Sequence, residues 1–222
     1  MIRGVIFDMD GLMFDTERLF YGSWDEVCAL QGAVNRPGFA DAIRGSNGPR
    51  AMEIIRSFYP DVDGERLMRD CYAVVQRKLA DGVPKKKGLD ELLAFLQARG
   101  IPMAIGSSTR SPMVRRNLEM AGVDGYFSAI SAGEMVARGK PEPEVFLLAA
   151  RMLGLPPEDC LVLEDSHNGI RAGHAAGCVT VMVPDLAPAT EEILVLCETC
   201  LPDLLAVRDW LAKELEGKEF TE

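Results

Sequence analysis

The chain has 222 residues, of which 48% are apolar, enough for one large domain or a medium domain with a smaller one attached. Its 24 Lys and Arg residues against 34 Asp and Glu residues give a net charge of −10. These values exclude a disordered tail and a disulfide-stapled miniprotein, and a surface of this charge repels nucleic acid and anionic lipid. An anionic partner must therefore be small and bound by a local positive site.

The distribution of charge argues against a membrane segment and a secretory signal. The longest stretch without Asp, Glu, Lys or Arg covers residues 172–184, whereas a membrane span needs roughly 20 apolar residues. Near the start, Asp8, Asp10 and Asp15 interrupt the apolar run that a signal peptide requires. We therefore expect a cytoplasmic protein that binds neither a membrane nor nucleic acid.

Short apolar runs alternate with amphipathic helical patterns, which is typical of an α/β protein with a parallel sheet covered by helices. The runs that predict strands cover residues 2–7, 102–106, 129–131, 160–163 and 179–183. The patterns that predict helices cover residues 89–99, 111–122, 143–153 and 169–176, and a glycine ends each of them. Ser111 is the expected cap of its helix, with Pro112 at the first helical position.

The segment from about residue 16 to residue 83 does not follow this alternation. It contains helical patterns, such as the spacing of Leu67, Cys71 and Val74, but no convincing strand. The sequence therefore predicts a helical insertion after the first strand.

The cysteines are scattered, and several lie in apolar runs, so in a reducing compartment they are expected to be small core residues. Cys197 and Cys200 form a CETC pair, for which a metal or redox site is the alternative. A zinc site would need further ligands, and the only histidines, His167 and His174, lie in another segment. We favour the structural interpretation.

The first predicted strand ends in paired acids. Asp8 and Asp10 lie two residues apart, so they point the same way while the chain is extended, and Gly11 allows a sharp turn after them. Such a pair suits a hard cation with oxygen ligands, or a division of work between a nucleophile and an acid/base. A solvated turn is the alternative.

Hydroxyl groups and a lysine follow later strands. Ser107 and Ser108 come directly after the second strand, where hydroxyls and free amides before a helix can bind an anion. An ordinary helix cap is the competing explanation. Lys140 is followed by Pro141 and Pro143, which stiffen the loop that holds it. A lysine held in this way suits a phosphate or an anionic nucleophile, although a lone lysine is usually solvated.

Glu164 and Asp165 follow an apolar strand directly, and two adjacent carboxylates are disfavoured as ions unless a cation is present. The carboxyl ends of parallel strands are where ligands bind in such sheets. Together, these strand ends predict a magnesium-assisted site for phosphoryl transfer.

In order and spacing, four motifs resemble the haloacid dehalogenase superfamily, in its β-phosphoglucomutase-like branch. They are DMDGLMFDT from Asp8, GSST from Gly106, GKPEPEVF from Gly139 and LEDSHNGIRAGHAAG from Leu163. The resemblance covers essentially the whole chain. It implies a Rossmann-like catalytic core of residues 1–14 and 85–222, with a helical cap of residues 15–84.

The resemblance also implies roles for single residues. Asp8 matches the nucleophile that accepts the phosphoryl group, and Asp10 matches the general acid/base. Ser107 and Ser108, with Lys140, fall at phosphate-binding positions. Mg²⁺ is the implied cofactor, and its ligands match four residues, with Asp10 contributing its backbone carbonyl: Asp8, Asp10, Glu164 and Asp165.

Two reactions occur in this branch, namely hydrolysis of small phosphorylated metabolites and isomerisation of sugar phosphates. Mutases of the branch carry a histidine where this chain has Phe20. They also carry an arginine in the cap loop of residues 45–50, where Arg50 lies two positions beyond the usual place of that arginine. These departures favour a Mg²⁺-dependent phosphatase for a small phosphorylated sugar or related metabolite. The alternatives are a β-phosphoglucomutase-type isomerase and a catalytically idle binding protein.

The sequence leaves specificity open. Arg18, Arg44, Arg50 and the lysines at 85–87 are each a specificity contact or a solvated charge, and for the three lysines we favour the solvated state. We expect a monomer or a weak oligomer.

Overall fold

The computed structural model describes residues 1–43, 46, 48–80 and 82–216. The chain divides into two compact units, which are Met1–Phe14 with Pro84–Glu222, and Asp15–Val83. The larger unit contains the β-sheet and the smaller unit is helical.

The larger unit is built on a six-stranded sheet in the order β3-β2-β1-β4-β5-β6, and every pair of neighbouring strands is parallel. This sheet confirms the predicted α/β class. The strands are β1 (Gly4–Phe7), β2 (Met103–Gly106), β3 (Ala129–Ser131), β4 (Cys160–Glu164), β5 (Val179–Met182) and β6 (Thr199–Cys200). The short β6 is an addition to the predicted strands.

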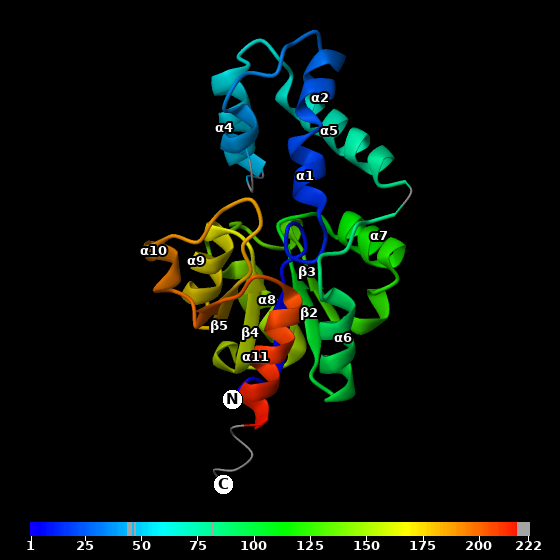
Figure 1. Cartoon of the computed structure of the whole chain (residues 1–222). Coiled ribbons are helices and arrows are strands. Elements are labelled where there is room, and N and C mark those ends of the chain that lie inside the picture. The colour runs from blue at the N-terminus through cyan, green and yellow to red at the C-terminus, as the bar shows by residue number, and fades with distance from the viewer. Residues whose placement is uncertain (44–45, 47, 81, 217–222) are drawn as a thin grey trace. The chain divides into compact units, whose positions relative to one another are not determined.

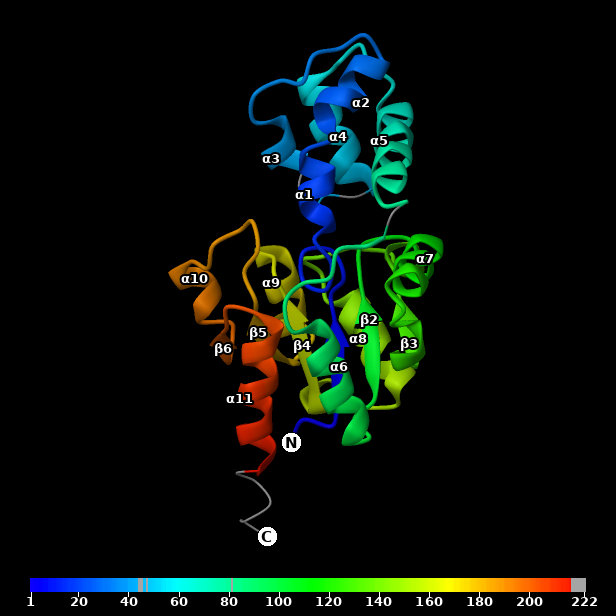
Figure 2. The ribbon, with the colours of Figure 1, turned by 45° about the vertical axis from the view of Figure 1, so that its right-hand side comes forward.

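Helices cover both faces of the sheet. They are α6 (Leu89–Ala98), α7 (Ser111–Ala121), α8 (Glu144–Leu153), α9 (His167–Ala175), α10 (Glu191–Leu194) and α11 (Leu204–Glu216). The helices α6 and α11 pack together on one face, and α8 lies on the other face (Figures 1 and 2). Single turns of 3₁₀-helix precede β3, α8 and β4: η1 (Asp124–Tyr126), η2 (Gly133–Met135) and η3 (Pro157–Asp159).

The central strands are buried on both faces, so their residues form continuous apolar runs. On one face, Ile6 and Val162 pack against Phe146 and Ala149 of α8. A Cβ atom at Gly106 would lie 2.9 Å from the Phe146 ring, so glycine allows α8 to approach β2 closely. Burial of each large apolar side chain contributes about 1.5–3 kcal/mol.

The smaller unit consists of α1 (Thr16–Tyr21), α2 (Trp24–Leu30), α3 (Phe39–Ile43), α4 (Gly48–Phe58) and α5 (Gly64–Lys78). Its described residues contain no strand, which confirms the predicted helical insertion after the first strand. Phe39 is fully buried, and its ring lies 4.9 Å from that of Trp24 and 4.8 Å from that of Tyr59. These aromatic contacts give Trp24 a role in the core of the unit.

The topology places one edge of the sheet in a position to bind a ligand. From β1, the chain adds β2 and β3 on one side and then crosses to β4 and β5 on the other. Ligands bind where the strand order reverses in this way, at the carboxyl ends of the strands. That point here lies between Phe7 and Leu163, which are paired in register.

Within the described part of the chain, no helix combines the length and apolar character needed to cross a membrane.

Candidate active site

Three buried carboxylates meet at the carboxyl ends of β1 and β4. The Asp8 amide donates to the Leu163 carbonyl at 3.0 Å and so continues the pairing of the two strands. Asp8, Glu164 and Asp165 are only 6%, 1% and 4% exposed, and one oxygen from each lies within 4.8 Å of the others. Such a group can hold a metal ion, because hard divalent cations take carboxylate oxygens as ligands.

Lys140 reaches into this cluster from the loop before α8. Its Nζ lies 2.5 Å from Asp8 Oδ1 and 2.7 Å from Glu164 Oε1, and its side chain is 6% exposed. The ammonium also lies 4.7 Å from the centre of the Phe146 ring. Lys140 therefore joins two carboxylates that are 156 residues apart in the sequence.

The charges in the cluster shift one another's protonation. Burial raises the pKa of Asp8 well above its usual range, Glu164 and Asp10 raise it further, and Lys140 acts in the opposite direction. Burial disfavours the charge on Lys140, but Asp8 and Glu164 outweigh it and raise the pKa of the lysine. Among the described residues, the cluster combines three carboxylates with the Lys140 ammonium, which contacts two of them, so the residues present suit an additional cation.

Glu164 is fixed by donors from Ser166, the residue that caps α9. Its Oε2 accepts from the Ser166 amide at 2.7 Å and from Ser166 Oγ at 2.9 Å. Ser166 Oγ in turn accepts from the Gly169 amide and caps the helix. A Cβ atom at Gly169 would collide with the Glu164 carboxylate, so glycine is required there for space. Neither Ser166 nor Gly169 is among the site residues that the sequence predicts.

A turn after β1 brings Asp10 and Gly11 beside the cluster. Gly11 has a φ of +88°, in the left-handed region that favours glycine, and its amide donates to the Phe14 carbonyl. A Cβ atom at Gly11 would collide with the Asp165 carboxylate. The Asp10 side chain is not part of the three-carboxylate cluster; its Oδ2 accepts from Thr109 Oγ1 at 2.7 Å.

Ser107 and Ser108 lie on the loop after β2, the strand next to β1. Ser107 is 1% exposed, its amide donates to the Ser131 carbonyl, and its Oγ accepts from the Thr109 amide at 3.0 Å. Ser108 is half-buried. The structure thus brings hydroxyl groups to the strand end that adjoins Asp8.

The expected cap of the next helix is wrong. Ser111 is the first residue of α7, with Arg110 at the cap position, and Glu134 takes over the capping. The Glu134 carboxylate accepts from the Ser111 amide at 2.9 Å and from Ser111 Oγ at 2.5 Å. The Ser111 amide at this helix start is therefore already hydrogen-bonded to a carboxylate. It is not one of the free amides that the sequence predicts there.

Most of the basic residues considered for specificity are paired. Lys85, Lys86 and Lys87 each contact an aspartate, namely Asp90, Asp185 and Asp203, at 2.6–2.7 Å. Lys86 is half-buried, so solvation alone does not describe the triple lysine. Arg18 pairs with Asp15 at 3.0 Å, Arg50 is exposed on α4, and Arg44 lies outside the described residues.

The six cysteines are free thiols. Cys28, Cys71, Cys160 and Cys178 are buried, as predicted. Burial raises the pKa of Cys197 to about 11, and it raises the pKa of Cys200 as well. Thiols with raised pKa values are poor nucleophiles and poor metal ligands, which supports the structural interpretation of the CETC pair.

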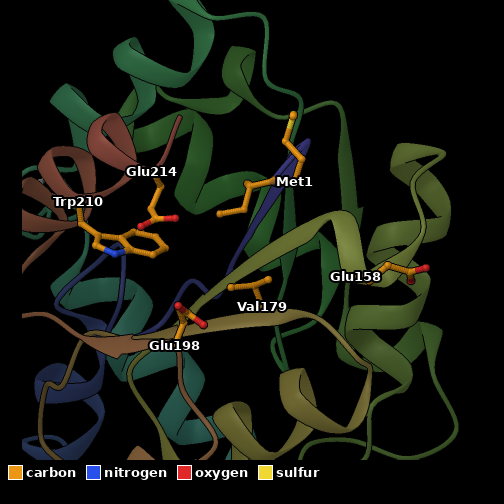
Figure 3. Close-up of a pocket in the computed structure, with 7 residues that line it drawn as sticks. Met1, Glu158, Val179, Glu198, Trp210 and Glu214 are labelled. Atoms are coloured by element: carbon orange, nitrogen blue, oxygen red, sulfur yellow. The ribbon is translucent and has the colours of Figure 1, made fainter. Parts of the chain in front are cut away.

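A surface pocket lies at the amino-terminal ends of the strands, away from this cluster. Figure 3 shows residues that line it. Residues that precede or begin strands line it together with two residues of α11: Met1, Ile2, Glu158, Val179, Glu198, Trp210 and Glu214. None of the predicted site residues belongs to it. The predicted site residues of the larger unit lie instead at the carboxyl ends of the strands.

Comparison with known proteins agrees with this arrangement. The family model of haloacid dehalogenase-like hydrolases matches residues 2–177, and the chain belongs to that family. Fructose-1-phosphate phosphatase YqaB of Escherichia coli (strain K12) is 35% identical over 181 residues, which cover 81% of this chain and 95% of that protein. β-Phosphoglucomutase of Bacillus subtilis (strain 168) is 29% identical over 207 residues, covering 89% and 90%.

Among solved structures, CbbY from Rhodobacter sphaeroides in complex with phosphate superimposes with a TM-score of 0.81 at 27% identity, covering 93% of this chain and 96% of that one. The predicted family, its β-phosphoglucomutase-like branch and the predicted enzyme class, a phosphatase, are confirmed.

Proposed function

We propose that this chain is a Mg²⁺-dependent phosphatase that hydrolyses a small phosphorylated sugar through an aspartyl-phosphate intermediate. The observation that carries the proposal is the ion pair of Lys140 with Asp8 and Glu164 inside a buried carboxylate cluster. A carboxylate attacks a phosphate only when the negative charge of the phosphate is balanced, and this cluster concentrates the groups that balance it.

In the first step, a carboxylate oxygen of Asp8 forms a bond to phosphorus while the bond from phosphorus to the sugar oxygen breaks. Asp10 gives its carboxyl proton to that oxygen, so the sugar leaves as a neutral alcohol. Lys140 holds Asp8 in place and balances charge during the transfer. Ser107 and Ser108 would donate hydrogen bonds to the phosphate oxygens.

In the second step, water attacks phosphorus and the bond to Asp8 breaks, which releases inorganic phosphate. Asp10, now a carboxylate, takes the proton from the attacking water and returns to its starting state. Mg²⁺ would be held by Asp8, Glu164, Asp165 and the Asp10 carbonyl, and it supplies positive charge to the phosphate oxygens. The side chains present fit such an ion, since three of them offer oxygens within 4.8 Å.

A sugar phosphate as substrate is supported by the relatives. The Escherichia coli relative is a fructose-1-phosphate phosphatase, although the Bacillus subtilis relative is a mutase. Hydrolysis is favoured here because Phe20 occupies the place of the mutase histidine. Phe20 packs edge-on against Tyr72, with 5.7 Å between ring centres, and an aromatic ring in this place cannot transfer a proton.

The test is an assay for free phosphate. Fructose 1-phosphate is supplied first, followed by β-glucose 1-phosphate with a trace of the 1,6-bisphosphate. We expect phosphate release from at least one sugar phosphate. Formation of glucose 6-phosphate without free phosphate would identify a mutase instead, and absence of reaction across a panel of phosphorylated sugars would support a binding protein.

Removal of divalent cations is expected to stop turnover, and addition of Mg²⁺ to restore it. Mg²⁺ should also raise the melting temperature, because at about 100 times its dissociation constant a ligand adds roughly 2.7 kcal/mol to the free energy of unfolding. In Asp165→Asn the melting temperature should no longer respond to Mg²⁺, while in Asp159→Asn, whose carboxylate pairs with Arg3, it should respond as in the unmodified protein. Activity that persists in EDTA would refute the metal site.

A further inference from the structure

The hydroxyl of Thr109 makes a hydrogen bond that has no part in the two proposed steps of the reaction. Thr109 Oγ1 donates to Asp10 Oδ2 at 2.7 Å, across 99 residues of sequence. The two residues follow β2 and β1, which are neighbouring parallel strands, with Phe7 paired to Ile105. Both side chains are therefore held at the same edge of the sheet as the carboxylate cluster.

Thr109 is itself fixed by its surroundings. Its amide donates to Ser107 Oγ at 3.0 Å, and its carbonyl accepts from the Gly133 amide at 3.1 Å. A Cβ atom at Gly133 would collide with the Ser108 carbonyl, so η2 lies directly against this loop. Two residues after Thr109, the amide and the hydroxyl of Ser111 donate hydrogen bonds to the Glu134 carboxylate. The backbone is thus held on both sides of the threonine.

We propose that Thr109 is the positioning residue for Asp10 in the proposed phosphatase reaction, on which this inference rests. By fixing Oδ2, the hydroxyl sets the plane of the Asp10 carboxyl group, and the other oxygen, Oδ1, exchanges the proton with the substrate. As the bond from phosphorus to the sugar oxygen breaks and the bond to Asp8 forms, the proton passes from Asp10 to the sugar oxygen. In hydrolysis, Asp10 takes back one proton from water.

The dependence on the leaving group separates this role from a structural one. A sugar alkoxide is a poor leaving group and needs the proton from Asp10, whereas 4-nitrophenolate leaves readily without it. The ratio kcat/KM covers the steps up to release of the leaving group, whereas kcat also includes hydrolysis of the aspartyl phosphate. Loss of positioning should therefore act on kcat/KM for sugar phosphates and on kcat for both kinds of substrate.

The experiment compares Thr109→Val with Thr109→Ser, which keeps the hydroxyl, using fructose 1-phosphate and 4-nitrophenyl phosphate. For Thr109→Val we expect kcat/KM on fructose 1-phosphate to fall about 10- to 100-fold, because displacement of a catalytic group by 1 Å can cost about 100-fold. On 4-nitrophenyl phosphate, kcat/KM should change less than about threefold, since little protonation is needed there, while kcat falls. Thr109→Ser should restore both substrates.

Thr180→Val is the matched control, because it removes another buried hydroxyl, which donates to the Leu196 carbonyl at 2.6 Å on β5. It should leave the ratio between the two substrates unchanged. Equal losses of kcat/KM on both substrates in Thr109→Val, or no loss on either, would overturn the positioning role while leaving the phosphatase intact. An unmodified protein that hydrolyses neither compound would overturn the proposed function and this inference together.

Discussion

Replacement of Asp8 by asparagine is expected to reduce turnover of every phosphate ester to below about 1%, because a hundredfold loss corresponds to only about 2.7 kcal/mol and covalent catalysis contributes more. The amide oxygen of asparagine is a poor nucleophile and cannot form the aspartyl phosphate. Initial rates of phosphate release measure the effect.

The same substitution should leave the fold intact. Burial disfavours the ionised form of Asp8 and raises its pKa, so a neutral side chain of the same shape is tolerated at this position. Lys140 keeps its second partner, Glu164. The melting temperature should be close to that of the unmodified protein. Asp90→Asn, at an exposed carboxylate paired with Lys85, is the control and should keep full activity. Activity above about 1% in Asp8→Asn would remove Asp8 from the role of nucleophile.

Replacement of Lys140 by methionine should affect both stability and catalysis. Methionine has a similar length but no charge, so Asp8 and Glu164 lose their shared partner in a buried site. Removal of one partner from a buried ion pair costs about 3–5 kcal/mol. Phosphate release should fall about 100-fold or more, because a charge placed at the transferring phosphate is lost. Denaturant unfolding and the phosphate assay measure the two effects.

The loss of stability in Lys140→Met should depend on pH. In the unmodified protein the pKa of Lys140 is raised, so its contribution to stability is complete below the unfolded value of about 10.4 and is lost only as the pH rises through the higher folded value. Without Lys140, the raised pKa of Asp8 rises further. A carboxyl group whose pKa is higher in the folded state than in the unfolded state lowers the stability of the protein as the pH rises above about 4. The destabilisation should therefore be larger at about pH 8 than at about pH 5.5.

Lys87→Met is the matched control for this prediction. Its ion pair with Asp203 is exposed, and such pairs contribute little. Its stability and its pH dependence should follow those of the unmodified protein. If Lys140→Met is as stable as this control, or if its destabilisation is the same at both pH values, the ion pair does not balance the buried carboxylates.

Local sequence pattern predicted the strands that build the site, because buried parallel strands form continuous apolar runs that are easy to recognise. The polar residues after those strands could then be assigned to one edge of the sheet. By that rule Asp8, Glu164 and Asp165 belong to one cluster, and their oxygens lie within 4.8 Å of one another. The two-residue β6 was missed because Thr199 and Cys200 are too few to form a pattern.

Local sequence pattern does not predict which side chains of distant segments form hydrogen bonds with one another. The sequence suggests Ser111 as a cap because serine followed by proline is a common helix start. In the structure, Glu134 from η2 accepts the hydrogen bond of the Ser111 amide instead. Likewise, the hydroxyl of Thr109 looks like part of an anion site, and only the folded chain shows that it contacts Asp10. The place of α11 could have been recognised, since Leu204, Val207 and Leu211 recur at helical spacing and are buried.

The central claim is that Asp8 carries the phosphoryl group, and chemical trapping tests it most directly. The protein is mixed with fructose 1-phosphate, quenched with acid during turnover, treated with borohydride to reduce the acyl phosphate, and digested with trypsin. The peptide of residues 4–18 contains Asp8, Asp10 and Asp15, and fragmentation in the mass spectrometer distinguishes them. We expect the reduced residue at Asp8. An unmodified Asp8 during active turnover, or a reduced residue at Asp10 in its place, would contradict the mechanism.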